Sequence, residues 1–398
     1  MTTTSEPRPW GVGRRGIALA GIAGGLTVLG SFVVALVRDV RYTDYEVYRG
    51  AVQYLLDGRG LYDFVLEGLP GQHMPFTYPP FAALVFLPSA WLPLGVGLYG
   101  WMAVLALLTV GLAAVVIDRS PARARKGTTE GRLVLGLGAL GLLLSEPVVN
   151  GITVGQVSLA LVAAVIADAV LVPPRWRGVL VGLAGAIKLT PLAFIPYFLV
   201  TRQWRAAAVA SATAAGATAL GFLVLPGESV RYWTQLLLDT SRVGEVDGVR
   251  NKSLLGVMAH WGIGGDAQRL LWLVLVLVIG GVALARARRH HLDGDELAAV
   301  LVVGMMTTVV SPISWPHHLV WLPLAGLFLA LRGGWARWAG WAVLVGFSAL
   351  VPTISFRPDL PTGLLLLGDS ATLVLVLFCL LGLPRTPSQA PAVPAHTR

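Results

Sequence analysis

Residues 97–117 read GLYGWMAVLALLTVGLAAVVI, an apolar run without a single charged side chain. An α-helix needs about 20 apolar residues to cross the hydrocarbon core of a bilayer. Similar runs recur from Gly16–Val37 near the start of the chain to Thr362–Leu383 near its end. Of the 398 residues, 55% are hydrophobic and only 13% are charged, whereas soluble domains carry about 25% charged residues. The sequence therefore predicts an integral membrane protein whose runs are helices, because backbone groups in lipid must bond internally.

Basic residues are distributed unevenly among the connections between these runs. They are dense in residues 118–132 and 286–291 and sparser in two longer stretches, residues 38–79 and 226–266. The positive-inside rule places the dense connections in the cytoplasm. The two longer stretches then become the first and second outer loops, which we expect to contain short helices.

The predicted organisation is an all-α polytopic membrane protein with about twelve transmembrane helices in a single domain, residues 16–383. Residues 1–15 are expected to be a cytoplasmic N-terminus, and the proline-rich residues 384–398 a disordered cytoplasmic tail. Two stretches, Phe81–Leu92 and Val179–Val200, could each be a full crossing, a half-helix or part of a hairpin. We expect a short helix in the first and a break around residues 188–191 in the second, where a proline interrupts helical hydrogen bonding.

Composition also excludes several classes of function. The net charge of +9 resides mainly in the connections, where it orients a protein against an anionic leaflet, so no nucleic-acid partner is expected. The single cysteine, Cys379, rules out an internal disulfide. No glycine-rich phosphate loop is present, so nothing indicates nucleotide-driven chemistry.

Two carboxylates, Asp44 and Glu46, lie in the first outer loop within the sequence TDYEVY, residues 43–48. Asp44 could cap the start of a helix, or it could act as a general base beside a membrane cavity. On a helix Glu46 points roughly 200° away from Asp44. The pair is therefore poorly placed to share a metal ion.

Other polar and aromatic residues are predicted on the same outer side. Tyr48 and Tyr78 could anchor the chain at the headgroup level or stack on sugar rings. Glu146 and Gln156 flank a tight outer turn, where they could bind a ligand or join neighbouring helices. Lys188 interrupts an apolar run, which is costly unless it meets a partner charge such as a lipid phosphate or extends to the interface.

Two further segments collect candidate ligand contacts. The sequence SPISWPHHLVW, residues 311–321, contains Trp315, His317 and His318 at a predicted outer junction. A histidine here could donate to a phosphate, relay a proton, or only bond at the interface. Adjacent helical residues point about 100° apart, so we expect one histidine, His318, to face a cavity and no shared metal. Arg250 and Asn251 in the second outer loop could hold a sugar or phosphate.

Six short motifs occur together in this chain: YTDYEVY (42–48), PFTYPPF (75–81), GQVSL (155–159), IKLTP (187–191), NKSL (251–254) and SPISWPHH (311–318). In this order they resemble glycosyltransferase family 87, over roughly residues 16–383. That family comprises actinobacterial mannosyltransferases that use polyprenyl phosphate mannose, and the last motif resembles its α-1,2-mannosyltransferase branch.

The resemblance implies a GT-C-like membrane glycosyltransferase of the cell membrane with its active site on the extracytoplasmic side. It implies inverting transfer of mannose to a phosphatidylinositol mannoside or to lipomannan and lipoarabinomannan, with no cofactor, although a divalent metal stays open. Asp44 takes the position of the catalytic carboxylate. The donor phosphate is expected to meet Lys188, His317, His318 and Arg250. Sugar or acceptor contacts are expected from Glu46, Tyr48, Tyr78, Glu146, Gln156, Asn251 and Trp315.

Two alternatives remain at this stage. A flippase or transporter for a polar lipid would share the membrane topology, but it predicts internal repeats that the sequence does not show. A membrane glycosyltransferase that uses another lipid-linked sugar would share the motifs. The sequence indicates neither the acceptor nor the oligomeric state.

Overall fold

The computed structural model describes residues 43–67, 73–355 and 367–384 of the chain. The predicted first membrane helix, Gly16–Val37, therefore lies outside the described residues. So do the N-terminal residues 1–15 and nearly all of the tail 384–398.

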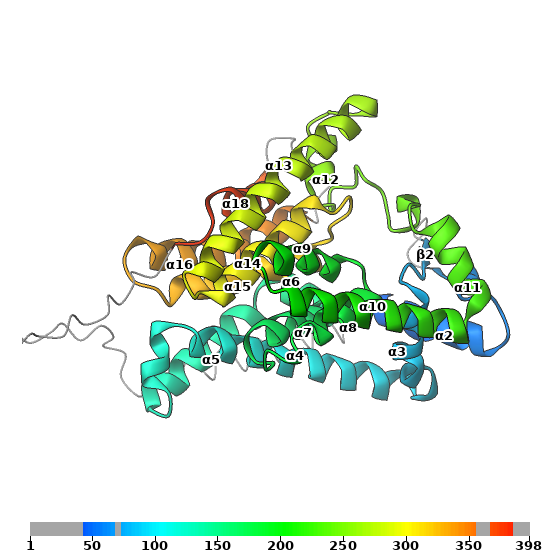
Figure 1. The fold of residues 1–398 in the computed structure, drawn as a ribbon, viewed down its shortest axis with the longest axis horizontal. Helices are drawn as coiled ribbons and strands as arrows, with labels where there is room; N and C mark the ends of the chain where they lie inside the picture. The colour runs from blue at the N-terminus through cyan, green and yellow to red at the C-terminus, as the bar shows by residue number, and fades with distance from the viewer. Residues whose placement is uncertain (1–42, 68–72, 356–366, 385–398) are drawn as a thin grey trace, which may run out of the picture.

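The described chain is almost entirely helical (Figure 1). In chain order its α-helices are α2 (Thr43–Leu56), α3 (Pro80–Trp91), α4 (Leu94–Asp118), α5 (Thr129–Leu143), α6 (Glu146–Thr153), α7 (Ser158–Val170), α8 (Val179–Ile187), α9 (Phe194–Val200), α10 (Trp204–Val224), α11 (Pro226–Arg231), α12 (Leu254–His260), α13 (Gly265–Leu292), α14 (Glu296–Val310), α15 (Trp321–Ala330), α16 (Trp335–Ser355) and α18 (Ser370–Leu381). Short 3₁₀ turns are η1 (Leu61–Asp63), η2 (Pro121–Arg125), η3 (Thr190–Ala193), η5 (Thr240–Arg242) and η6 (Pro316–Val320), and η4 (Tyr232–Leu236) is a π-helical turn. Strands β1 (Val65–Glu67) and β2 (His73–Pro75) pair antiparallel, with Leu66 opposite Met74.

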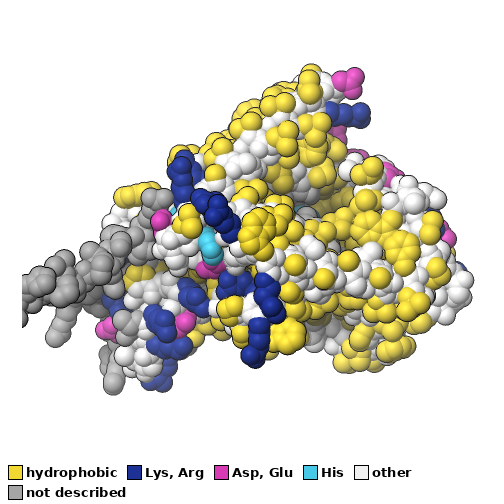
Figure 2. All heavy atoms as spheres, viewed as in Figure 1, with side chains coloured by type: hydrophobic (Ala, Val, Ile, Leu, Met, Phe, Trp, Pro, Cys, Tyr) yellow, Lys and Arg dark blue, Asp and Glu magenta, His cyan; other side chains and the backbone are white. Residues whose placement is uncertain are grey.

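Three described helices, α4, α10 and α13, are long and apolar enough to cross a membrane. The pair α5 and α6 would add one span if it is counted as a single helix bent by 67°. Side chains on α10 and α13 point outward, with Leu223 80% exposed and Leu277 75% exposed, and yellow hydrophobic surface covers much of Figure 2. Exposed apolar helices of this kind face lipid and identify a membrane protein. The total of about twelve spans stays a prediction.

The core is centred on α14, whose side chains from Leu297 to Val309 are all buried. A helix that is apolar all round is buried on every face. Beside it, α15 and α16 approach so closely that a Cβ at Gly340 would lie 2.2 Å from the backbone nitrogen of Ala330. Small residues permit this close backbone contact, which is how helices pack in membranes.

Both irregular stretches behave as the sequence predicts. The short helix expected in Phe81–Leu92 is α3, which begins at Pro80, a residue suited to a first helical turn. The stretch Val179–Val200 is interrupted, because α8 ends at Ile187 and Lys188 is extended with φ −147° and ψ 128°. A break here directs the lysine side chain away from the helix axis and into the site described next.

Candidate active site

A cavity of about 820 Å³ opens among the segments that carry the sequence motifs. Its walls come from α2, the α6–α7 turn, the α8 break, residues 236–250 and residues 307–321. Nine of the predicted site residues line it: Asp44, Tyr48, Tyr78, Gln156, Lys188, Arg250, Trp315, His317 and His318. Tertiary folding thus brings together residues that the sequence spreads over most of its length.

Asp44 lies in the first turn of α2, and the backbone N–H groups of Asp44 and Tyr45 both donate to the carbonyl oxygen of Val154 at 3.1 Å. The Asp44 side chain accepts a 2.8 Å hydrogen bond from Gln156 Nε2. Burial raises the pKa of Asp44 to about 6, against the opposing effects of Lys188, Arg250 and the Gln156 bond. A carboxylate whose pKa lies near neutrality is suited to accept a proton.

The Gln156 side chain connects the polar residues of the site, because both its amide oxygen and its amide nitrogen form hydrogen bonds. Its Oε1 accepts from the hydroxyls of Tyr48 at 2.7 Å and Tyr78 at 2.9 Å. Its Nε2 therefore points the other way, toward Asp44 at 2.8 Å and His317 Nε2 at 3.3 Å. The tyrosine hydroxyls thus act as donors that fix the orientation of the amide. Both residues line the cavity, and their expected sugar contact stays a prediction.

The turn before Gln156 requires a glycine. Gly155 has φ 69°, and a Cβ there would lie 2.7 Å from the Cβ of Tyr45. Both the left-handed backbone and the close approach of α2 exclude a larger residue. The GQVSL motif therefore holds the α6–α7 turn against the first turn of α2, which carries Asp44.

Lys188 and His318 lie side by side on one wall of the cavity. Lys188 Nζ lies 2.7 Å from His318 Nε2 and donates to Ser158 Oγ at 3.0 Å. His318 Nδ1 accepts the backbone N–H of Trp315 at 3.0 Å, so we assign its ring proton to Nε2. The ammonium and this N–H are then two donors with no acceptor between them, and an anionic oxygen placed between the two would accept from both.

The expectation that only His318 would face a cavity is wrong, because His317 lines it too. The two rings are perpendicular, with centroids 4.5 Å apart, and the cavity extends around this corner. His317 Nδ1 donates to Asn150 Oδ1 at 3.0 Å, which leaves Nε2 to accept from Gln156. His317 therefore positions Gln156, and its expected contact with a donor phosphate stays a prediction, as does that of His318.

Arg250 lines the cavity from the connection that precedes α12. Burial lowers the pKa of its guanidinium, while the charges of Glu146 and Asp44 raise it. Arg250 thus lies within the electrostatic reach of the candidate base. Trp315 packs against the same loop, because a Cβ at Gly244 would lie 2.4 Å from its ring.

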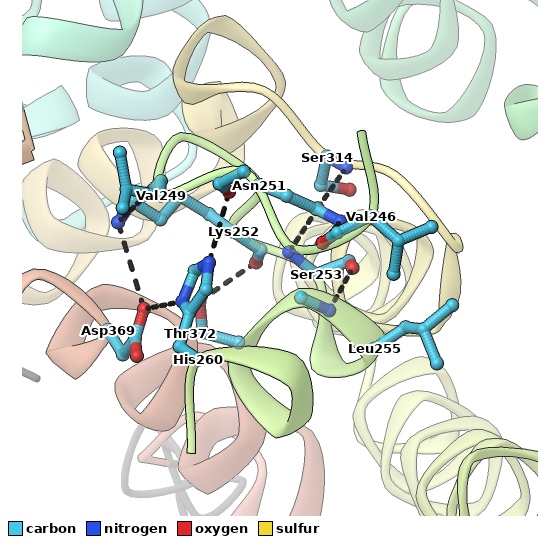
Figure 3. Close-up of polar contacts among 12 residues, drawn as sticks. Val246, Val249, Asn251, Lys252, Ser253, Leu255, His260, Ser314, Asp369 and Thr372 are labelled. Atoms are coloured by element: carbon cyan, nitrogen blue, oxygen red, sulfur yellow. Dashed lines mark hydrogen bonds and ion pairs between the residues drawn. The ribbon is translucent and has the colours of Figure 1, made fainter. Parts of the chain in front are cut away.

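Three predicted contacts lie outside the cavity lining: Glu46, Glu146 and Asn251. Glu46 lies two residues after Asp44 in α2, so it points to a different side of the helix, as helical geometry predicts. Glu146 begins α6 and influences the cavity through its charge on Arg250. Asn251 is fully buried, and its side chain bonds backbone groups of four residues, Val246, Pro312, Ser253 and Ser314 (Figure 3). This gives Asn251 a structural role in place of the expected sugar contact.

Sequence reasoning missed two members of the site, Asn150 and Ser158. Both lie in segments already singled out, but nothing in the sequence shows that Asn150 orients His317 or that Ser158 accepts from Lys188. Across the residues that the structure describes, no three His, Cys, Asp or Glu side chains converge on a possible metal position. Metal dependence stays a question for experiment.

Residues 76–312, more than half of the chain, match the model of glycosyltransferase family 87. The chain belongs to glycosyltransferase family 87. The predicted resemblance is confirmed, and the chain is a membrane-bound glycosyltransferase.

Relatives within family 87 carry specific names. A Mycobacterium tuberculosis protein named polyprenol-phosphate-mannose-dependent alpha-(1-2)-phosphatidylinositol mannoside mannosyltransferase is 34% identical over 74% of this chain and 71% of its own length. A Mycolicibacterium smegmatis protein, named for phosphatidylinositol pentamannoside as acceptor, is 37% identical over 76% of this chain and 74% of its own. No solved structure shows significant similarity to the chain.

Proposed function

We propose that this family 87 glycosyltransferase transfers mannose from polyprenyl phosphate mannose to a phosphatidylinositol mannoside, with inversion and formation of an α-1,2 linkage. The names of the mycobacterial relatives support the donor, acceptor and linkage. One observation in the structure carries the proposal. A carboxylate fixed by Gln156 and a Lys188–His318 donor pair line one cavity.

The proposed step is a single displacement. The acceptor hydroxyl oxygen attacks the anomeric carbon of mannose and transfers its proton to the Asp44 carboxylate. The bond from that carbon to the phosphate oxygen breaks, and both electrons leave with the phosphate. Lys188, His318 and Arg250 stabilise the added negative charge of the polyprenyl phosphate, because charge-assisted bonds are strongest where charge develops. Attack opposite the leaving group converts a β-linked donor into an α-linked product.

We further propose an extracytoplasmic site in a protein that crosses the membrane about twelve times. The connections predicted to be cytoplasmic come together in the structure. Residues 119–121 of the first connection and residues 293–297, directly after the second, line one small pocket. Most visible Lys and Arg side chains gather in the left half of Figure 2, whereas α2 and α11 of the predicted outer loops lie at the right in Figure 1. This separation supports the proposed orientation.

The test is mannose transfer by the purified full-length protein in lipid nanodiscs, with radiolabelled polyprenyl phosphate mannose and phosphatidylinositol mannosides. We expect a labelled product that an α-1,2-specific mannosidase digests. Asp44→Asn should reduce turnover by at least about a hundredfold, since a general base contributes 10²–10⁴-fold, and it should still bind the donor lipid. Glu46→Gln on the same helix is the matched control and should stay near normal.

Three outcomes would overturn parts of this proposal. Lipid translocation without a new glycosidic bond would indicate a flippase. Transfer of a sugar other than mannose would overturn the donor. Near-normal turnover by Asp44→Asn would remove that residue from the reaction.

A further inference from the structure

A buried ionic cluster lies beside the cavity without lining it, formed by Lys252, His260 and Asp369 (Figure 3). Their side chains are only 4%, 11% and 1% exposed. Asp369 Oδ1 lies 2.9 Å from His260 Nδ1 and 3.7 Å from Lys252 Nζ. Buried charges are costly unless they are paired and hydrogen-bonded. Asp369 also lies beyond residues 76–312, the part that the family model matches.

The two cationic side chains of the cluster hold the backbone just before Arg250. His260 Nε2 lies 3.0 Å from the carbonyl oxygen of Gly248, and Lys252 Nζ donates to that of Val249 at 2.8 Å. Both nitrogens of His260 therefore face acceptors, which only a doubly protonated ring satisfies. Burial and the Lys252 charge lower the pKa of His260, but the bonds to Asp369 and Gly248 and the Asp369 charge outweigh them and raise it.

The backbone just after Arg250 is held as well. The Lys252 N–H donates to the carbonyl oxygen of Ser314 at 2.6 Å, and the Lys252 carbonyl accepts from Thr372 Oγ1 at 2.8 Å. Asn251, the residue between Arg250 and Lys252, adds the four hydrogen bonds from its side chain to backbone groups that are described above (Figure 3). Hydrogen bonds thus fix the backbone on both sides of Arg250, and the charged Arg250 side chain lines the cavity.

We propose that Lys252, His260 and Asp369 form a positioning cluster that aims Arg250 at the donor phosphate, with Asp369 as its anchor. The proposal rests on the phosphate-binding function proposed for Arg250. Its physical basis is charge balance. Arg250 and Lys252 repel each other, as the lowering of the Lys252 pKa by burial and by the Arg250 charge indicates, and Asp369 offsets that effect. Without the carboxylate, the loop would hold a buried lysine and histidine with no counter-charge from α18.

The primary variant is Asp369→Asn, which keeps the shape of the side chain and removes its charge. We expect at least about a tenfold fall in kcat/KM for the donor, because a small misplacement of a reacting contact can cost 10²-fold. The KM for the acceptor should stay unchanged. Hydrogen–deuterium exchange over residues 246–254 should increase.

A double-mutant cycle separates positioning from general stability. If Asp369 acts through Arg250, Asp369→Asn should add little to the loss already caused by Arg250→Ala. The matched control is Asp168→Asn, another fully buried aspartate, which accepts from the backbone N–H groups of Gly178, Leu180 and Val181. This control should lower thermal stability and leave the donor KM and the exchange of residues 246–254 unchanged.

The outcomes distinguish this proposal from the proposed function. Unchanged donor kinetics in Asp369→Asn, or losses that add fully to those of Arg250→Ala, would overturn the positioning cluster. If the wild-type protein transfers no mannose, the proposed function fails, and exchange over residues 246–254 still tests the anchor: unchanged exchange overturns it. Should Asp369→Asn fail to fold, His260→Gln, which leaves the Lys252–Asp369 pair intact, takes its place in the same cycle.

Discussion

At the scale of single residues, Asp44 owes its proposed role to its neighbours. Gln156 occupies one carboxylate oxygen, and burial raises the pKa to about 6. A base with this pKa is ionised at neutral pH and still holds a transferred proton well enough to assist bond formation. Glu46, two residues along the same helix, lies outside the cavity lining.

The pKa of Asp44 predicts how activity depends on pH. Because the base must be ionised, kcat/KM for mannose transfer should fall as the pH drops from neutrality through about 6. Gln156→Leu removes a hydrogen bond that stabilises the carboxylate, so the midpoint should move to higher pH. A pH–rate profile of the wild type and this variant measures both effects. A flat profile between pH 5 and pH 8 would exclude Asp44 as the titrating group.

Lys188 offers the second prediction at this scale. Lys188→Met keeps the length of the side chain but removes its charge, so the donor KM should rise by roughly 10–100-fold, the equivalent of a charged hydrogen bond worth about 1.5–3 kcal/mol. Steady-state kinetics with varied donor measure the effect. Lys126→Met, at a lysine 77% exposed and paired with Asp118, is the matched control. A normal donor KM in Lys188→Met would mean that the lysine only extends to the interface.

At the scale of elements, helix contact depends on small residues. The pair α15 and α16 meets at Gly326 and Gly340, where a Cβ at Gly340 would lie 2.6 Å from the Gly326 carbonyl oxygen. These helices support the segment that carries His317 and His318, since α15 begins directly after η6.

Gly340→Ala should therefore destabilise the protein by about 1–3 kcal/mol, because the added methyl group must push the two helix backbones apart. The loss would appear as a lower Tm in detergent or nanodiscs. Gly346→Ala in the same helix is the matched control, since a Cβ there meets nothing within 4 Å. That control should be neutral or slightly stabilising. Equal Tm values for the two variants would argue against close packing at Gly340.

At the scale of the whole molecule, the active-site cavity is assembled from segments that lie far apart in the sequence. Asp44 and Gln156 are 112 residues apart, and Lys188 and His318 are 130 apart. In the proposed topology, helices that cross the bilayer return their connections to one face or the other, which brings these segments together.

The proposed orientation predicts the accessibility of single cysteines in intact cells. Cysteines at Arg123 and Arg289, both exposed in predicted cytoplasmic connections, should be shielded from an impermeant thiol reagent. A cysteine at Asp63, exposed in the first outer loop, should be labelled. Permeabilised cells provide the control, in which all three should react, while the native Cys379 is buried. Labelling at Arg123 in intact cells would overturn the topology and the outer active site with it.

The sequence by itself determined the class of protein, the family, the break at Lys188 and nine of the residues that line the cavity. These features depend on local composition: hydropathy along one run, a proline after a lysine, or a short motif. Helical spacing also predicted that Asp44 and Glu46 lie on different faces of a helix.

Only the tertiary structure decided which contacts each of those residues makes. It connected Gln156 to Asp44, both tyrosines and His317. It gave His317 a positioning role beside His318, and it placed Asn251 outside the cavity lining. It also brought Asp369 to His260, 109 residues away. Such contacts join segments whose pairing depends on how the helices pack in three dimensions. A hydrogen bond between distant segments leaves no trace in the local pattern of a single sequence, so these roles appear only once the chain is folded.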